Sequence, residues 1–446
     1  MMTTNHSSRR NFLKTSGLAA GAFLAASHLK VHAAGSETIQ IALVGCGGRG
    51  GGAAINALNT KSAPLKLIAA ADAFPDRLKR MAMLQENFPD KVDLPPERCF
   101  AGYDAYKKAI DCLRPGDVAL LATPPGFRPL HVEYAVKKGV HVFMEKPFAT
   151  DSPGTRRIQA AAKLADEKNV KIACGLMWRH CKAREEVIDR IHNGEIGDVT
   201  LLRGFRMHNS WYAPNRQTWK GSELEFQIRS FHGFDWIGAS LFIDYCIHNI
   251  DVACWAKGAW PVSAIGLGGR STPDVAGTSY DSYYTEFTFP DGSFLTSHGR
   301  YINNCFARYQ DYAHGTKGAA LLMGSLGGAE TKIYKNQMMT PENVVWAYPG
   351  KEPDPYQIEH NLFFDAIVNN KPYNEGHRAA EANFASLLSR AAINTGQIVT
   401  WDQIVQSEVE LLPGGVDNLT AETQPPILPD DKGHYPYAIP GKDVKI

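Results

Sequence analysis

The sequence predicts a two-domain protein, in which an α/β domain with a doubly wound parallel sheet precedes an α+β domain with an open, mostly antiparallel sheet. Two observations predict this order. Short apolar runs alternate with helical patterns from residue 39 to about residue 148, as in consecutive βαβ units. After Pro261 apolar residues recur with period two, which is typical of strands with one buried face. At 446 residues, the chain is long enough for both domains.

A glycine-rich turn opens the first domain. The apolar run 39–44 ends in Gly45-x-Gly47-x-x-Gly50, a helical pattern follows, and a second apolar run, 65–71, closes on Asp72. In a dinucleotide-binding βαβ unit these glycines permit the tight turn, the approach of backbone N–H groups to a pyrophosphate, and close helix packing.

Asp72 indicates which dinucleotide is bound. It follows the turn by about 20 residues, where an acid accepts a hydrogen bond from a ribose 2′-hydroxyl and repels a 2′-phosphate. NAD is therefore predicted in preference to NADP. Arg49 keeps NADP as the alternative, because a nearby arginine can accommodate the extra phosphate.

Polar residues follow two later strands of the first domain. Thr123 comes after the run 118–122, and Glu145-Lys146-Pro147 comes after the run 140–144. Ligands bind at the carboxyl ends of parallel strands. There Lys146 can polarise a carbinol or carbonyl oxygen, and burial would lower its pKa toward catalytic usefulness. A solvated surface lysine is the alternative.

The second domain carries an Asp-x-x-x-His pair, Asp244 and His248, on a helical pattern. The i, i+4 spacing places both side chains on one helical face. The carboxylate is expected beside the imidazole, holding its orientation and favouring its imidazolium form. A purely structural pair is the alternative.

These motifs together resemble the Gfo/Idh/MocA oxidoreductases, which are sugar and polyol dehydrogenases with an N-terminal Rossmann domain and a C-terminal open-sheet domain. The resemblance rests on the glycine turn, Asp72, Thr123-Pro124-Pro125, His131 and the phrase from Gly139 to Pro147, and extends to about residue 405. It implies that Asp244-x-x-x-His248 is the catalytic motif and that a cis peptide bond precedes Pro147. The predicted cofactor-binding residues are Gly45, Gly47, Gly50, Arg49, Asp72, Thr123, His131, Glu145, Lys146 and Arg179.

The stretch 209–240 is expected to be a long loop rich in aromatic residues. Long loops are usually functional or disordered, and aromatic content argues against disorder. Flat rings beside polar side chains suit a carbohydrate. A loop packed on its own aromatics, or a subunit interface, is the alternative. The predicted substrate contacts are Trp211, Tyr212, Trp219, His232 and Tyr245.

The remaining elements complete the expected domains. A hairpin turn is expected at Pro290-Asp291-Gly292. The free face of the second sheet is predicted to form a homo-oligomer interface, as often in the family. The predicted helices are 152–168, 182–191 and 375–395; the predicted strands are 170–174, 198–208, 262–267, 282–289, 293–300, 319–323 and 398–402. The predicted domains are a signal peptide at 1–34, a dinucleotide-binding domain at 37–175, a substrate and oligomerisation domain at 176–411, and an extended proline-rich tail at 412–446.

The N-terminus is predicted to be a twin-arginine export signal. Arg9-Arg10-Asn-Phe-Leu-Lys precedes a short apolar stretch and an Ala-x-Ala-like end near Ala34. The export machinery is thus an expected partner, and the location is periplasmic or otherwise extracytoplasmic. No segment is long and apolar enough to be expected to span a membrane. The leader holds four basic and no acidic residues, so the rest of the chain is net acidic and no nucleic-acid partner is expected.

The eight cysteines contain no CxxC pair, so no metal site is expected, and most are predicted to be buried as small apolar side chains.

Three functions follow in order of preference. The first is oxidation of a sugar, polyol or glycoside hydroxyl, in which His248 removes the proton, Lys146 stabilises the alkoxide and Asp244 orients the histidine. Either Lys146 or His248 could be the base. Export implies a tightly bound NAD that is regenerated in the same cycle. The second is a glycoside hydrolase or lyase that works through a transient keto-sugar with no net redox change. The third is a non-catalytic sugar-binding protein.

Replacing Arg9 and Arg10 by lysine should trap the precursor in the cytoplasm, because the twin-arginine route requires the arginine pair. Fractionation of cells expressing the variant and the unaltered chain would test this. Normal export of the lysine variant would contradict the signal assignment.

Overall fold

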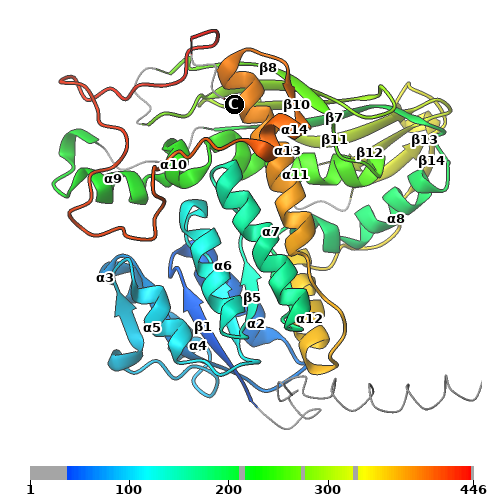
Figure 1. Ribbon diagram of the computed structural model, residues 1–446. Coiled ribbons are helices and arrows are strands. Elements are labelled where there is room, and N and C mark those ends of the chain that lie inside the picture. Colours follow the sequence, from blue (N-terminus) through cyan, green and yellow to red (C-terminus); the bar gives the residue numbers. More distant parts are fainter. Residues whose placement is uncertain (1–37, 210–215, 273–276, 325–329, 443–445) are drawn as a thin grey trace, which may run out of the picture.

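The computed structural model describes residues 38–209, 216–272, 277–324, 330–442 and 446, and these form two sheet domains (Figure 1). A six-stranded parallel sheet occupies the first domain and a nine-stranded sheet the second, so the predicted fold class is confirmed. The predicted N-terminal export signal lies outside the described residues. In the described part of the chain, no helix has the length and hydropathy needed to cross a bilayer.

The first sheet has the strand order β3-β2-β1-β4-β5-β6, and all of its adjacent strands run parallel. The chain direction across the sheet reverses between β1 and β4, where doubly wound sheets bind ligands. The strands are almost continuously apolar because helices bury both faces. The strands are β1 Ile39–Val44, β2 Leu65–Asp72, β3 Cys99–Ala101, β4 Val118–Leu121, β5 His141–Met144 and β6 Ile172–Cys174; the helices are α2 Gly48–Asn59, α3 Pro75–Leu78, α4 Met81–Asn87, α5 Ala105–Asp111, α6 Arg128–Lys137 and α7 Ser152–Glu167.

The second sheet has the order β14-β13-β12-β11-β7-β10-β9-β8-β15. Among its described strand pairs only β7 and β10 run parallel, so the sheet is mostly antiparallel, as predicted. The strands are β7 Val199–His208, β8 Ser263–Gly269, β9 Ser282–Thr288, β10 Phe294–Tyr301, β11 Arg308–Gly315, β12 Ala319–Met323, β13 Lys332–Tyr334, β14 Val344–Ala347 and β15 Val399–Thr400; the helices of this part are α8 Lys182–His192, α11 Leu241–Lys257, α13 Gly376–Thr395 and α14 Trp401–Gln406.

The stretch 209–240 is not the loop that its composition suggests, since it contains α9 (Glu223–Arg229) and α10 (Asp235–Gly238). The Ser222 hydroxyl caps α9 by accepting from the Glu225 N–H at 3.2 Å, which is a local signal for a helix start. The C-terminal tail passes beside α9 (Figure 1), and Gln227 donates to the Ile427 carbonyl at 2.7 Å.

Helix α12 (Pro355–Val368) follows the second sheet in the chain but packs on α2 of the first domain. Gln357 donates to the Asn56 carbonyl at 2.9 Å, which ties the two helices together. The sequence pattern did not predict this helix.

All eight cysteines are free, and five of them are buried, as predicted.

Asn383 joins the two domains from the middle of α13. It is fully buried, and its amide oxygen accepts from the Phe148 N–H at 3.1 Å. Its amide nitrogen donates to the Thr155 hydroxyl at 2.8 Å. The Asn383 side chain therefore ties the segment that follows Lys146-Pro147 to helix α13.

Replacing Asn383 by alanine should lower the free energy of unfolding by about 1–3 kcal/mol, because buried polar groups of Phe148 and Thr155 lose their partner. Chemical denaturation would measure the change. Asn418→Ala removes an exposed asparagine of the C-terminal tail and should change stability by less than about 0.5 kcal/mol. Equal losses in the two variants would contradict the structural role of Asn383.

Candidate active site

The glycine turn has the geometry that a dinucleotide requires. Gly45 has φ +97°, and a Cβ there would lie 2.6 Å from the Ala122 carbonyl carbon. A Cβ at Gly50 would lie 1.8 Å from the Gly45 oxygen, so helix α2 can start only with glycine there. A Cβ at Gly47 would meet no atom within 4 Å, so this face of the turn is open to a ligand.

Asp72 ends β2 and closes this turn. Its carboxylate accepts from the Cys46 N–H at 2.8 Å and from the Phe74 N–H at 3.0 Å. Burial raises the pKa of Asp72, while these two N–H groups oppose the change. The side chain thus reaches the glycine turn from the next strand, as an acid that binds a ribose should.

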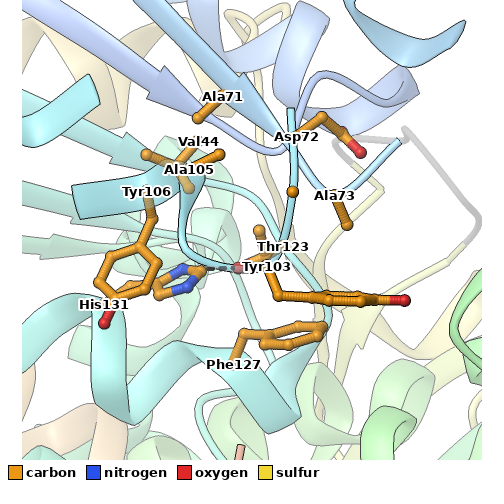
Figure 2. Close-up of a pocket in the computed structure, with 11 residues that line it drawn as sticks. Val44, Ala71, Asp72, Ala73, Tyr103, Ala105, Tyr106, Thr123, Phe127 and His131 are labelled. Carbon is orange, nitrogen blue, oxygen red and sulfur yellow. Dashed lines mark hydrogen bonds between the residues drawn. The ribbon is translucent and has the colours of Figure 1, made fainter. Parts of the chain in front are cut away.

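Asp72 lines a small hollow of about 270 Å³ beside the turn (Figure 2). Figure 2 shows the rings of Tyr103 and Phe127 on one side and those of Tyr106 and His131 on another. These flat apolar walls next to a carboxylate suit the adenosine half of a dinucleotide.

Thr123 and His131 form part of this wall. The Thr123 hydroxyl lies 3.2 Å from His131 Nδ1, and the imidazole stacks on Tyr106 with ring centroids 4.2 Å apart. Burial and the nearby Arg128 lower the pKa of His131 to about 3, so the ring is neutral. Arg128 is buried and donates to the Leu121 and Thr123 carbonyl groups at the end of β4. Its sequence context gave no signal for this role.

Arg49 does not lie beside Asp72. Its Nε is 2.7 Å from Glu145 Oε1, and its guanidinium lies 4.6 Å from the centre of the Tyr356 ring. Glu145 follows β5, which is three sheet positions from β2, or roughly 14 Å at the usual strand spacing. Arg49 is thus engaged far from the position of a ribose 2′-phosphate.

Lys146 reaches from the first domain to Asp244 of the second. Its Nζ donates to Asp244 Oδ1 at 2.8 Å and to the Asp244 carbonyl at 2.6 Å. The peptide bond between Lys146 and Pro147 is cis, as the family resemblance implied. His232 Nε2 lies 3.1 Å from Asp244 Oδ2, so both carboxylate oxygens are engaged. Burial raises the pKa of Asp244, but Lys146 and His232 outweigh it and hold the pKa below its usual value.

The expected contact between Asp244 and His248 is therefore wrong. The two residues share a helical face, but the carboxylate turns to Lys146 and His232 instead. His248 is buried, and its Nδ1 has no hydrogen-bond partner in the described part of the chain. Burial, and then the charges of Lys146 and Arg206, hold the pKa of His248 well below its usual value, although Asp244 opposes them. The imidazolium expectation is wrong as well, because the neutral form is favoured.

Tyr245 is the second predicted substrate contact, after His232, that lies at this cluster. Its ring centre is 5.7 Å from Lys146 Nζ and 5.1 Å from Arg206 Cζ. The ring also stacks with His232 at 6.2 Å.

The other predicted ligand contacts either lie away from this cluster or belong to residues outside the described part of the chain. The Trp219 indole donates to the Ser222 carbonyl at 3.0 Å and packs on Phe226, so this residue belongs to the α9 cluster rather than to the substrate site. Arg179 is paired with Asp251 at 2.8 Å. Trp211 and Tyr212 lie outside the described residues.

Comparison with known proteins supports the class that this fold and site define. Residues 39–176 match the model of the GFO_IDH_MocA family, described as an oxidoreductase family with an NAD-binding Rossmann fold. The chain is 28% identical over 167 residues to dTDP-3,4-didehydro-2,6-dideoxy-alpha-D-glucose 3-reductase of Actinomadura kijaniata, covering 37% of this chain and 45% of the relative. The curated relatives that match are spanned over only 40–51% of their lengths.

Solved structures match over most of the chain. Scyllo-inositol dehydrogenase from Lactobacillus casei has a TM-score of 0.60 at 22% identity, covering 82% of this chain and 100% of that one. Aldose-aldose oxidoreductase from Caulobacter crescentus has a TM-score of 0.62 at 17% identity, with 82% and 100% covered. At these identities the likeness shows the two-domain fold. The family match itself covers only the first domain, residues 39–176.

Replacing Asp72 by alanine should weaken NAD binding by roughly one to two decades, because a charge-assisted hydrogen bond contributes about 1.5–3 kcal/mol. Discrimination against NADP should relax, since the repelling charge is lost. Titration of both dinucleotides would test this, with exposed Asp90→Asn as a control. Asp72→Asn keeps an acceptor for the N–H groups of the turn. If NAD affinity falls in Asp72→Ala but not in Asp72→Asn, the loss of affinity comes from the turn and not from the ribose.

Proposed function

We propose that the protein is an NAD-dependent oxidoreductase that acts on a CH–OH group of a sugar, polyol or glycoside. The observation that supports it most is that Lys146, just after β5 in the dinucleotide domain, binds Asp244 on α11, the helix that also carries the buried His248. Known relatives support the substrate class: the matched curated proteins include 1,5-anhydro-D-fructose reductase and UDP-N-acetylglucosamine 3-dehydrogenase.

The residues present fit the cofactor. The open face at Gly47 can receive the pyrophosphate, and Asp72 can receive the ribose hydroxyl. We assign NAD rather than NADP because Arg49 is engaged by Glu145. When bound, the nicotinamide supplies a hydride acceptor.

The roles of the two candidate bases differ in this geometry. Neutral His248 can accept the hydroxyl proton, whereas Lys146, held by Asp244, already donates hydrogen bonds and suits stabilisation of the alkoxide. Asp244 acts as a positioning residue that fixes the lysine. His232 holds the second carboxylate oxygen and thereby fixes Asp244.

Two further features are proposed with this activity. The predicted signal would deliver the folded protein outside the cytoplasm, where free NAD is scarce, so we infer a tightly held cofactor that is regenerated by a second sugar. A redox-neutral cleavage of glycosides would satisfy the same constraint. A homo-oligomer through the second sheet is the assembly we propose.

Native mass spectrometry of the purified protein should detect a bound dinucleotide. The nicotinamide absorbance should change when at least one member of a panel of sugars, polyols and glycosides is added. Release of an aglycone without net absorbance change would favour the redox-neutral alternative. A bound dinucleotide with neither signal would favour the sugar-binding protein.

Lys146→Ala and His248→Ala should each lower turnover by about 10²–10⁴-fold, the usual contribution of an acid–base group. Their double variant should be far less impaired than the product of the two losses, because groups acting as a unit are non-additive. Asp244→Asn should keep the fold and lower turnover, since it removes the charge that holds Lys146.

Bound cofactor must be quantified in each variant, because an emptied site would imitate a catalytic loss. Exposed His377→Ala is the matched histidine control. Near-normal turnover of cofactor-loaded His248→Ala would show that the proposed mechanism is wrong.

A further inference from the structure

A cavity of about 1000 Å³ opens beside the Lys146–Asp244 cluster, where β7 ends and β11 begins. Tyr245 of α11 forms one wall, and Arg206 and Tyr309 come from the two strands. The cavity lining contains two arginines, Arg206 and Arg308, and no carboxylate. Its character is therefore cationic and aromatic.

Arg206 is a buried cation that forms no ion pair with a carboxylate in the described part of the chain. It is 9% exposed. Its Nε and Nη1 atoms have no hydrogen-bond partner there. The guanidinium lies over the Tyr309 ring at 3.6 Å, and the Trp178 indole holds the Tyr309 hydroxyl at 2.9 Å. The cation is thus fixed in place before a ligand arrives.

Stacking does not compensate for this burial. A cation–π contact contributes about 0.5–2 kcal/mol, whereas removing an ion from water costs several kcal/mol. Buried charges are normally paired. An uncompensated arginine that lines a cavity is therefore expected to complete its bonding with an anion from outside the chain.

The nearby acid does not fill this role. Asp311 lies buried on the neighbouring strand and accepts from the Asn249 amide at 2.6 Å. Burial raises the pKa of Asp311 to about 7, against the opposing effects of Asn249, Arg184 and Arg206. Its carboxyl group is only partly charged near neutral pH, and that partial charge acts on both Arg184 and Arg206.

Arg308, the second arginine of the cavity lining, directs its guanidinium toward the opposite face of the sheet from Arg206. Arg308 Nη2 donates to the Tyr312 hydroxyl at 3.0 Å, and its guanidinium lies over the Phe205 ring at 3.9 Å. Phe205 and Arg206 are consecutive in β7, so their side chains point to opposite faces of the sheet. Arg206 is the cation that faces Tyr245 and the reacting centre.

We propose that the substrate is an acidic carbohydrate, whose carboxylate binds Arg206 while a ring hydroxyl meets Lys146 and His248. The position of the hydroxyl rests on the proposed function. Tyr245 lies within 6 Å of both cations, so one sugar unit can bridge them and stack its C–H face on an aromatic ring. A carboxylate is assigned rather than a phosphate dianion because it matches the single charge of Arg206.

Binding of glucuronate and galacturonate to the holoprotein should be at least tenfold tighter than binding of glucose and galactose, measured by calorimetry. Arg206→Gln should weaken uronate binding by about 10- to 100-fold, the effect of about 1.5–3 kcal/mol for a hydrogen bond to a charged group. Neutral sugars should bind this variant and the unaltered protein alike. Arg206→Lys keeps the positive charge but loses the paired N–H donors of the guanidinium. Its uronate affinity should therefore lie between those of the unaltered protein and Arg206→Gln.

Arg203→Gln is the matched control, because it removes the same charge from the same strand on the opposite face and does not line the cavity. Melting temperature and bound dinucleotide are compared across the variants. Equal affinity for uronates and neutral hexoses would overturn the proposal, as would equal losses in Arg206→Gln and Arg203→Gln. Tighter binding of glucose 6-phosphate than of glucuronate would overturn the carboxylate assignment.

The same titrations separate this proposal from the proposed function. Uronate binding that depends on Arg206, without any change in nicotinamide absorbance or any product, would leave the anion site standing and remove the oxidoreductase activity. Turnover of neutral sugars, together with uronate binding that Arg206→Gln does not weaken, would leave the oxidoreductase activity standing and remove the anion site.

Discussion

The buried carboxylate of Asp244 is the point at which the two domains meet chemically. It lies on α11 of the second domain and binds Lys146, which follows β5 of the first domain, as well as His232. Leaving one partner of a buried ion pair alone costs about 3–5 kcal/mol. The relative placement of the two sheets is therefore tied to the placement of Lys146.

This arrangement also sets the state of His248. Asp244 gives its oxygens to Lys146 and His232, and burial, the largest influence, holds the pKa of His248 below its usual value against the opposing charge of Asp244. A histidine that is neutral at rest can act as a base, and a lysine fixed by a carboxylate can stabilise negative charge. The contacts of Asp244 thus favour different roles for Lys146 and His248, which the i, i+4 spacing alone could not distinguish.

The sequence predicts those parts of the fold that depend on local pattern. The run into Gly45, the acid at Asp72 and the Glu145-Lys146-Pro147 phrase each lie where a βαβ unit requires them, and β1 occupies the predicted residues. Helix α11 is recognisable because Asp244 and His248 lie on a helical pattern.

Contacts between distant segments could not be predicted in this way. Helical spacing shows that Asp244 and His248 share a face, but the competing partner His232 comes from a segment whose helices are short and irregular. Trp219 illustrates the same limit, because aromatic composition does not distinguish a ring that binds a sugar from one that packs on Phe226. Strand β11 was missed because Arg308 and its neighbours are mostly polar and aromatic, without an apolar period.

Arg206 lies beside Tyr245, whose ring also lies near Lys146, and is the residue proposed to bind the acidic group of the substrate. Its charge contributes to the low pKa of His248, and no carboxylate of the described residues pairs with it. In the first domain, by contrast, Arg49 is matched by Glu145. The two arginines therefore differ in charge balance: Arg49 is paired within the chain, whereas Arg206 keeps N–H groups that are unpartnered within the described residues for the anion proposed above.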